Sequence, residues 1–326
     1  METAHVIPHE LPRFQALNGV YEPSGIQPLA DGRFIVVEDE ERHALSLLRI
    51  RNDHVERKAL NAPFWSWGDG DFWKLDDLEG VTADRAGHVY AITSHSRDSD
   101  GDEHKARERL VRFRIDGDSV VDPQVVGNLK RALTEAHPVL AAAAEVRRVK
   151  TDGGLNIEAL EMSADQRRLL IGFRSPLLDG KAIVASLENP AAIFDDRAAP
   201  RIAPRLTTLD LGGNGIRALA HVPFLNGYLL IGGPVARERV AFEMWFWNGD
   251  ENARPRRVRV AGLSGFEHAE GVAAATIDGR PSLIVVSDDG SREDGRFASY
   301  LILRPEQLQI ESSSPLHETD APRPIP

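Results

Sequence analysis

The sequence predicts an all-β fold, a five-bladed β-propeller of four-stranded antiparallel blades, as a single domain over residues 1–326. Three observations predict it: a pattern that recurs five times, room for four strands in each repeat, and an abundance of turn-forming residues. Glycine occurs 27 times and proline 20 times, which favours many turns over long helices. A six-bladed ring is the main alternative, although no sixth copy of the pattern is visible.

Each copy of the pattern contains a small residue, an apolar run, a tight turn and a second apolar run. The copies cover residues 23–39, 78–94, 157–173, 216–232 and 269–286. Two further apolar stretches follow each copy, and the last of them, at 308–312, is weak. We expect the segment around 13–17 to pair with this weak strand, complete the final blade and close the ring. An open sandwich of hairpins is the other way to stack such units.

Apolar residues recur at helical spacing between the second and third repeats. They are Leu129, Leu133, Ala136, Leu140 and Ala143. The spacing predicts a short helical insertion over residues 128–150, and Pro138 divides it because proline is tolerated only in the first turn of a helix. Strand order places this insertion on the same face as the other long loops, whereas the turns on the opposite face are short. We therefore expect ligands on the loop-rich face, with the insertion as a cap or a lid. Residues 312–326 are expected to form a flexible tail.

The composition limits the classes of partner. A net charge of −11 argues against nucleic acid and against an anionic membrane, because both need a basic surface. A cation or a small polar or anionic molecule fits better, and a protein partner stays open. Without cysteine there is no thiolate metal site. No nucleotide, haem or flavin motif is indicated. The first residues lack a basic segment followed by an apolar one, so a cytoplasmic location is expected, or a periplasmic one if a signal peptide has been removed.

Charged residues occupy equivalent positions at the start of successive inner strands. The residues just before the aligned small residues are Ser24, Glu79, Glu158, Arg217 and Glu270. The second strands return to the same face and end near Asp39, Ser94, His95, Arg174 and Asp288. A ring of carboxylates with two arginines is therefore predicted at one mouth of the channel.

Three or more carboxylates at one pole can hold Ca²⁺ or Mg²⁺, and arginine can grip an anion in a bidentate way. The candidate metal ligands are Glu79, Glu158, Glu270 and Asp288. The catalytic candidates are Arg174 and Arg217 as anion clamps and His95 as proton carrier. Further candidates for ligand binding are Ser24, Asp39, Ser94, Arg97, Trp67 and Trp73. Alternatively, the carboxylates pair with the arginines and tie the blades together without any chemistry.

Several segments together resemble a bacterial propeller family known as a domain of unknown function, which is similar to the phytase-like or esterase-like propellers. They are PSGI with FIVVED, LEGV with YAITSHSR, LNIEAL with LLIGFRSP, and AEGV with IVVSDDG. The resemblance implies a propeller and hydrolysis of a phosphoester or carboxylic ester with a bound divalent cation. Two positions depart from the group's pattern, because Ser24 and Arg217 stand where a carboxylate is expected. Binding of a small polar ligand or a protein partner without catalysis is the alternative function.

Overall fold

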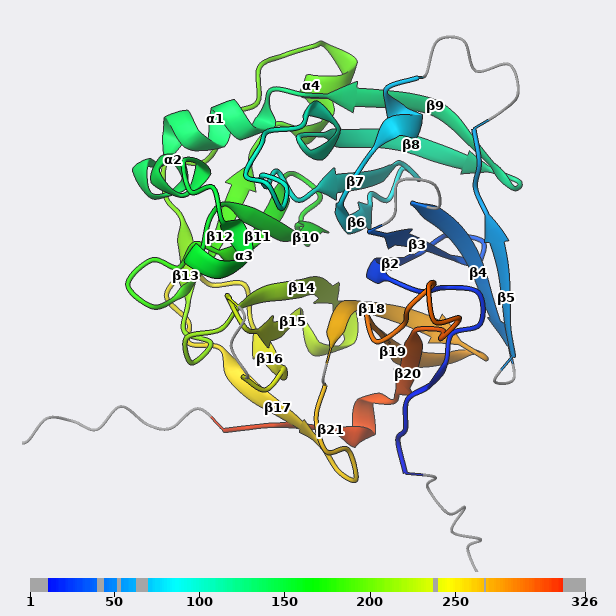
Figure 1. The fold of residues 1–326 in the computed structure, drawn as a ribbon. Helices are drawn as coiled ribbons and strands as arrows, with labels where there is room; N and C mark the ends of the chain where they lie inside the picture. The colour runs from blue at the N-terminus through cyan, green and yellow to red at the C-terminus, as the bar shows by residue number, and fades with distance from the viewer. Residues whose placement is uncertain are drawn as a thin grey trace, which may run out of the picture.

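The structure is a computed structural model that describes residues 11–39, 44–51, 54–62, 70–236, 240–266 and 268–312. Trp67 and the predicted tail from residue 313 onward lie outside the described residues. The described chain forms five antiparallel sheets arranged in a ring (Figure 1). The inner strands of successive blades contact one another around the ring, and the fifth contacts the first. The five-bladed propeller predicted from the repeats is confirmed.

Each blade runs outward from an inner strand. Blade one is β2 (Pro23–Pro28), β3 (Phe34–Glu38), β4 (Leu45–Arg51) and β5 (His54–Ala59). Blade two is β6 (Leu78–Ala83), β7 (Val89–Thr93), β8 (Leu110–Asp116) and β9 (Ser119–Val126). Blade three is β10 (Asn156–Met162), β11 (Leu169–Ser175), β12 (Ala182–Leu187) and β13 (Thr207–Leu209). Blade four is β14 (Gly215–Val222), β15 (Gly227–Gly233), β16 (Glu243–Trp247) and β17 (Arg256–Val260). Blade five is β18 (Ala269–Ile277), β19 (Arg280–Ser287) and β20 (Ser299–Leu303), with β1 (Gln15–Ala16) as its outermost strand.

The two ends of the chain fasten different blades. Strand β1 pairs with β20, so the opening segment completes blade five and closes the ring, as expected. The expected partner was wrong, however. The weak strand β21 (Leu308–Ile310) pairs with β17 and becomes a fifth strand of blade four. The 3-10 turn η4 (Pro305–Gln307) directly after β20 separates the two strands and carries the chain to the neighbouring blade.

The start of every inner strand carries a shift of register against the second strand. In blade two, Leu78 pairs with Thr93 and Gly80 with Ile92, so Glu79 is the extra residue of a β-bulge. The same shift occurs in all five blades. The extra residues are Ser24, Glu79, Glu158, Arg217 and Glu270, the five positions aligned from the sequence. The bulge therefore determines the direction in which each of these side chains points.

Inner strands crowd around the axis at the small residue after the bulge, most tightly at Gly80. A Cβ atom added to Gly80 would lie 2.7 Å from the backbone nitrogen of Leu160 in the next blade. One added to Gly271 would lie 2.5 Å from Cγ2 of Val286 in the second strand of its own blade and 3.3 Å from Cα of Gly25 in the next inner strand. Distances below 3 Å cannot be accommodated without movement of the backbone or the packed side chains, so these positions require glycine.

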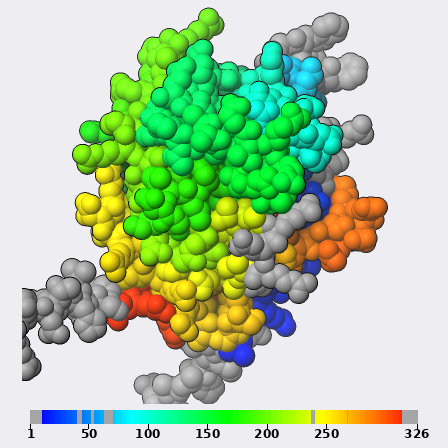
Figure 2. Space-filling model, turned by 60° about the vertical axis from the view of Figure 1, so that its left-hand side comes forward, coloured from blue at the N-terminus to red at the C-terminus, as the bar shows by residue number. Residues whose placement is uncertain are grey.

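The helical insertion lies between blades two and three, as predicted. Its helices are α1 (Leu129–Ala136), α2 (Pro138–Ala144) and α3 (Val149–Asp152), and Pro138 is the first residue of α2. Their buried residues pack against the apolar side chains of blades two and three. A fourth helix, α4 (Pro190–Asp195), follows β12. The insertion, in green, forms part of the surface that faces the viewer in Figure 2. Within the described ranges, no helix has the length and apolar character needed to cross a membrane.

Replacing Gly80 with Ala tests the close approach of the inner strands. We expect a loss of about 1–3 kcal/mol in the free energy of unfolding, because the added methyl group overpacks the contact with Leu160. Urea denaturation measures the loss. Gly70→Ala is the matched control, since none of the described residues lies within 4 Å of its added Cβ. Equal stability of the two variants would show that the inner strands can separate at no cost.

Candidate functional site

The five bulged residues converge at one mouth of the channel, and each has at most 15% of its side chain exposed. Four of them, Ser24, Glu79, Glu158 and Glu270, line a cavity of about 20 Å³. A cavity of this size holds one water molecule or one ion and no organic substrate. Any larger ligand must therefore rest on the outside of the mouth.

Four side chains at the mouth form what we call the arginine cluster: Glu158, Glu270, Arg174 and Arg217. The carboxylate of Glu158 accepts hydrogen bonds from Nη1 of Arg174 at 3.1 Å and from Nη1 of Arg217. Nη2 of Arg217 lies 3.2 Å from Oε1 of Glu270. Burial lowers the pKa of Arg217, but the charges of Glu158 and Glu270 outweigh it and raise that pKa overall. Both carboxylates are thus compensated by cations of the same chain.

A second group, which we call the acidic cluster, consists of Asp39, Asp77 and Glu79. One carboxylate oxygen from each residue lies within 4.8 Å of the other two. Among the described residues, Asp39 and Glu79 have no cationic nitrogen within 4.0 Å. Burial, followed by the charge of Asp77, raises the pKa of Glu79 well above its usual range and that of Asp39 to about 9. The cluster therefore carries more carboxylates than its surroundings neutralise.

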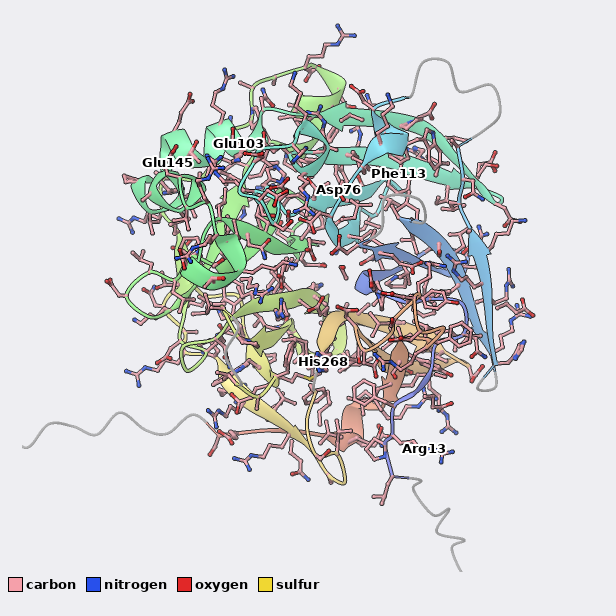
Figure 3. All side chains as sticks on the ribbon, viewed as in Figure 1. Arg13, Asp76, Glu103, Phe113, Glu145 and His268 are labelled. Carbon is pink, nitrogen blue, oxygen red and sulfur yellow. The ribbon has the colours of Figure 1, made fainter. Side chains whose placement is uncertain are left out.

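Asp77 is held rigidly in the acidic cluster. Its Oδ2 accepts hydrogen bonds from the hydroxyls of Ser94 and Ser96, and Nη1 of Arg107 lies 3.0 Å away. The backbone of Asp77 is left-handed, with a φ of 63°, a conformation that costs energy in a residue other than glycine. The neighbouring Asp76, labelled in Figure 3, accepts a hydrogen bond of 2.7 Å from Nε of Arg107. These contacts orient one carboxylate before any ligand arrives.

The ends of the second strands reach the mouth through a repeated backbone contact. The amides of Asp39 and Asp288 donate to the carbonyl oxygens of Glu22 and His268, the residues two positions before the bulges of blades one and five. Asp288 is half-buried, and burial followed by the charge of Glu270 raises its pKa to about 8. The structure thus places Asp288 beside Glu270 at the rim, outside the acidic cluster.

His95 is fully buried near the mouth. Its Nδ1 lies 2.8 Å from the carbonyl oxygen of Thr93, and its Nε2 has no hydrogen-bond partner among the described residues. Burial lowers its pKa to about 4, so the ring is neutral at pH 7. The charged groups acting on it are Lys130 and Arg109 rather than the carboxylates of the mouth.

Two candidates for ligand binding, Arg97 and Trp73, make structural contacts. Nε of Arg97 donates to the carbonyl oxygen of Ala144 at 3.0 Å, and its Nη2 lies 3.2 Å from Oε1 of Glu103, so Arg97 holds the insertion against blade two. Glu103 and Glu145, both near Arg97, are labelled in Figure 3 beside α1 and α2. Trp73 lies in η1 (Phe72–Lys74) and packs on the core between blades one and two. Trp67 lies outside the described residues.

Sequence reasoning missed Asp77 and Arg107. The alignment took only the residue directly before each small residue, whereas Asp77 stands further upstream, before Leu78 and the bulge. The bulge and the left-handed backbone bring its side chain beside Glu79. Comparing the positions further upstream of each small residue across the repeats could have drawn attention to Asp77. Arg107 comes from η2 (Lys105–Arg107) in a loop without a repeated counterpart, so no pattern marks it.

The acidic cluster fits a hard divalent cation. Its donors are carboxylate oxygens, which Ca²⁺ and Mg²⁺ prefer. Glu79 is 8% exposed and lines the 20 Å³ cavity without a hydrogen-bond donor among the described residues. Asp77 binds the hydroxyls of Ser94 and Ser96 through Oδ2, and a side-chain hydrogen bond links it to Asp39 within the cluster. Waters would complete the coordination sphere, since three carboxylates are fewer than such ions require.

A buried carboxylate lies deeper in the channel. Glu161 of β10 accepts a hydrogen bond of 3.3 Å from Oγ1 of Thr82 in β6 and one from the amide of His221 in β14. It therefore links three neighbouring blades. Burial raises its pKa to about 8.

Replacing Arg217 with Met tests the arginine cluster. We expect a loss of about 3–5 kcal/mol in the free energy of unfolding, because Glu158 and Glu270 stay buried with less compensation. The change Glu270→Gln in the same chain should recover part of it. Urea denaturation provides the measurement. The control is Arg259→Met, whose ion pair is exposed and should cost less than about 1 kcal/mol. Similar losses for the two arginines would contradict this role.

Glu161 predicts a pH dependence of stability. Its carboxyl holds a proton up to about pH 8 in the folded state and loses it near 4.5 in the unfolded state, so stability present at low pH is lost as the pH rises between these values. We expect Glu161→Gln to make the decrease of the free energy of unfolding with pH less steep, by at most about 1.4 kcal/mol per pH unit. Urea denaturation at pH 5, 6.5 and 8 tests it. An unchanged slope would show that Glu161 is ionised in the fold.

Similar solved structures are distant in sequence. The major allergen Mala s 1 of Malassezia sympodialis is 11% identical, with a TM-score of 0.50 and coverage of 91% of this chain and 96% of that chain. A putative oxidoreductase (glucose dehydrogenase) of Thermus thermophilus is 17% identical, with a TM-score of 0.46 and coverage of 90% and 100%. The periplasmic gluconolactonase PpgL of Pseudomonas aeruginosa is 13% identical, with a TM-score of 0.40 and coverage of 85% and 70%. Such likeness concerns the fold alone.

No curated protein matches the sequence. One family does match, over residues 128–299, which span the insertion, blades three and four and most of blade five. This is more than half of the 326 residues. The chain therefore belongs to the family described as "Protein of unknown function (DUF3616)".

Proposed function

We propose that the protein is a divalent-cation-dependent hydrolase of small esters, with Ca²⁺ or Mg²⁺ held between Asp39, Asp77 and Glu79. The observation that carries the proposal is the acidic cluster, in which three carboxylate oxygens lie within 4.8 Å of one another. The arginine cluster compensates Glu158 and Glu270, which leaves Glu79 as the uncompensated bulge residue. Glu158 and Glu270 are therefore assigned a structural role rather than metal binding.

The resemblance of the repeats to phytase-like and esterase-like propellers supports hydrolysis as the reaction class. Within it, the contacts of the arginines favour a carboxylic ester over a phosphoester. Arg174 and Arg217 already bind Glu158, and Nε of Arg174 also donates to the carbonyl oxygens of Pro234 and Val235. Neither guanidinium is free to grip a phosphate in a bidentate way.

When bound, the cation supplies a Lewis acid that polarises an ester carbonyl and lowers the pKa of a water molecule. Arg107, Ser94 and Ser96 keep the Asp77 carboxylate turned toward the cluster. Asp288 is the better-placed proton carrier, because it is half-buried at the rim, within reach of solvent, and holds a proton at neutral pH. His95 is buried away from solvent and would need a conformational change to exchange protons.

The first test is cation binding. After treatment with EDTA, addition of Ca²⁺, Mg²⁺ or Mn²⁺ should raise the melting temperature, because binding to the folded state alone adds about 2.7 kcal/mol at a hundred times Kd. Glu79→Gln should remove the increase, since it takes one anionic ligand from the cluster. Glu306→Gln is the control, because Glu306 is an exposed glutamate of η4 that belongs to neither cluster. This variant should keep the cation-dependent increase in melting temperature. No increase with any of the three cations rejects the proposal.

The second test is turnover with p-nitrophenyl acetate, p-nitrophenyl butyrate and p-nitrophenyl phosphate. We expect cation-dependent release of p-nitrophenol from the carboxylic esters, abolished by Glu79→Gln and reduced by Asp288→Asn. A faster reaction with the phosphate would overturn the assignment of the arginines. Cation binding without turnover on an extended ester panel would favour the alternative, a propeller that binds a small polar ligand or a protein partner on this face.

A further inference from the structure

A large cavity lies at the opposite end of the channel from the mouth. It has a volume of about 1000 Å³, and we call it the turn-side cavity because the turns between inner and second strands line it. Its walls come from blades one, two, four and five. The sequence predicts short turns on this face and ligands on the loop-rich face. Short turns, however, leave the end of the channel uncovered, and the hollow is the consequence.

The walls of this cavity are largely apolar. Leu29, Phe34 and Val89 come from the hairpins of blades one and two, and Pro223 and Phe224 come from η3 (Pro223–Leu225) of blade four. Phe224 is 37% exposed, one of four large hydrophobic side chains that are exposed in the described ranges. Exposure of such a ring to water is unfavourable, so binding of an apolar group in the cavity would be stabilised by burial of this surface.

Both acidic and basic side chains line the cavity. Among its acidic residues, Asp31 pairs with Arg33 at 2.6 Å. Asp84 binds Nδ1 of His88 at 2.9 Å and accepts from the hydroxyl of Tyr90 at 3.2 Å. Asp116 is exposed on the rim. Asp31 and Asp84 are therefore occupied, whereas Asp116 has no ion pair among the described residues.

Two arginines at this end have no such partner. No carboxylate oxygen lies within 4.0 Å of Arg85 or Arg114 in the part of the chain that the structure describes. Arg85 has a hydrogen bond of 3.4 Å to the carbonyl oxygen of Ala164, and Nη2 of Arg114 lies 3.0 Å from Nε2 of His88. A Cβ atom on Gly87 would lie 3.9 Å from Nη1 of Arg114, so Arg114 reaches the turn that carries Arg85. Both arginines line the cavity, Arg85 from the turn of blade two and Arg114 from β8.

We propose that the turn-side cavity binds a small amphipathic anion, a carboxylate attached to an acyl chain or an apolar ring. The carboxylate pairs with Arg85 and Arg114, which offer a fork of donors matched to it. The apolar part packs on Leu29 and Phe224 and covers the exposed surface of the hollow. This site shares no residue with the mouth, so it stands whether or not the mouth binds a cation.

Isothermal titration calorimetry with octanoate tests the proposal, run at two temperatures because burial of apolar surface changes the heat with temperature. Arg85→Gln and Arg114→Gln should each weaken binding by about tenfold or more, the effect of losing a charged hydrogen bond. Phe224→Ser should weaken it by removing apolar contact, with little risk to folding because the ring is exposed. Octanol should bind at least about tenfold more weakly than octanoate.

Arg254→Gln is the matched control, since Arg254 is an exposed arginine outside the cavity with no carboxylate within 4.0 Å among the described residues. It should bind octanoate as the unaltered protein does. Absence of heat with octanoate at both temperatures overturns the proposal. So does equal affinity for octanol, or a loss of binding that follows Glu79→Gln at the mouth instead of the two arginine changes. The last outcome would assign octanoate to the mouth as a product analogue of the proposed hydrolase.

Discussion

The crowding of five inner strands around one axis is the constraint on which the rest of the structure depends. Each strand meets it in the same way, with a bulge and then a small residue that lets the next strand approach. Gly80 lies so close to Leu160 that no side chain fits between them. The bulge has a second effect, because its extra residue leaves the ladder and is free to face the mouth. Packing at the axis and charge at the mouth are therefore two results of one backbone feature.

Burial of several charged residues at the mouth costs desolvation free energy. Some of the carboxylates are compensated by arginines and others are not. Arg217 occupies a bulge position itself and pairs with the bulged glutamates on either side of it, in blades three and five. Glu79 of blade two is not adjacent to Arg217, and its neighbours are Asp39 and Asp77. An ion-pair network needs no ligand, whereas Asp39 and Glu79, which have no cation within 4.0 Å among the described residues, need protons or a cation. The mouth thus contains a structural ion-pair network on the side of Arg217 and an acidic cluster around Glu79 that is suited to bind a cation.

The repeat predicted the fold because hydrophobic patterning and turn chemistry recur in each blade. It also aligned the five residues that start the inner strands near the mouth, since equivalent residues in a closed ring meet at one end, but it did not predict that they form bulges. Which carboxylates come within 4.8 Å of one another was not predictable, because this depends on the left-handed backbone of Asp77 and on Arg107 from a non-repeated loop. The pairing of β21 with β17 was missed for a related reason. A short turn such as η4 can redirect the chain to a neighbouring blade, and three residues carry too little pattern to show it.

The two ends of the channel differ in size and polarity, although the same inner strands form both of them. At the mouth the bulges narrow the space to about 20 Å³ and fill it with charge, whereas at the other end short turns leave about 1000 Å³ with apolar walls. Glu161 and Thr82 lie between the small residues and the turns and join adjacent inner strands. A ligand at one end can influence the other only if it binds two arrangements of the ring with different affinity. The inner strands approach so closely at Gly80 that an added Cβ would lie 2.7 Å from the backbone nitrogen of Leu160. This packing leaves the strands little freedom for a second arrangement, so the geometry favours two sites that act independently.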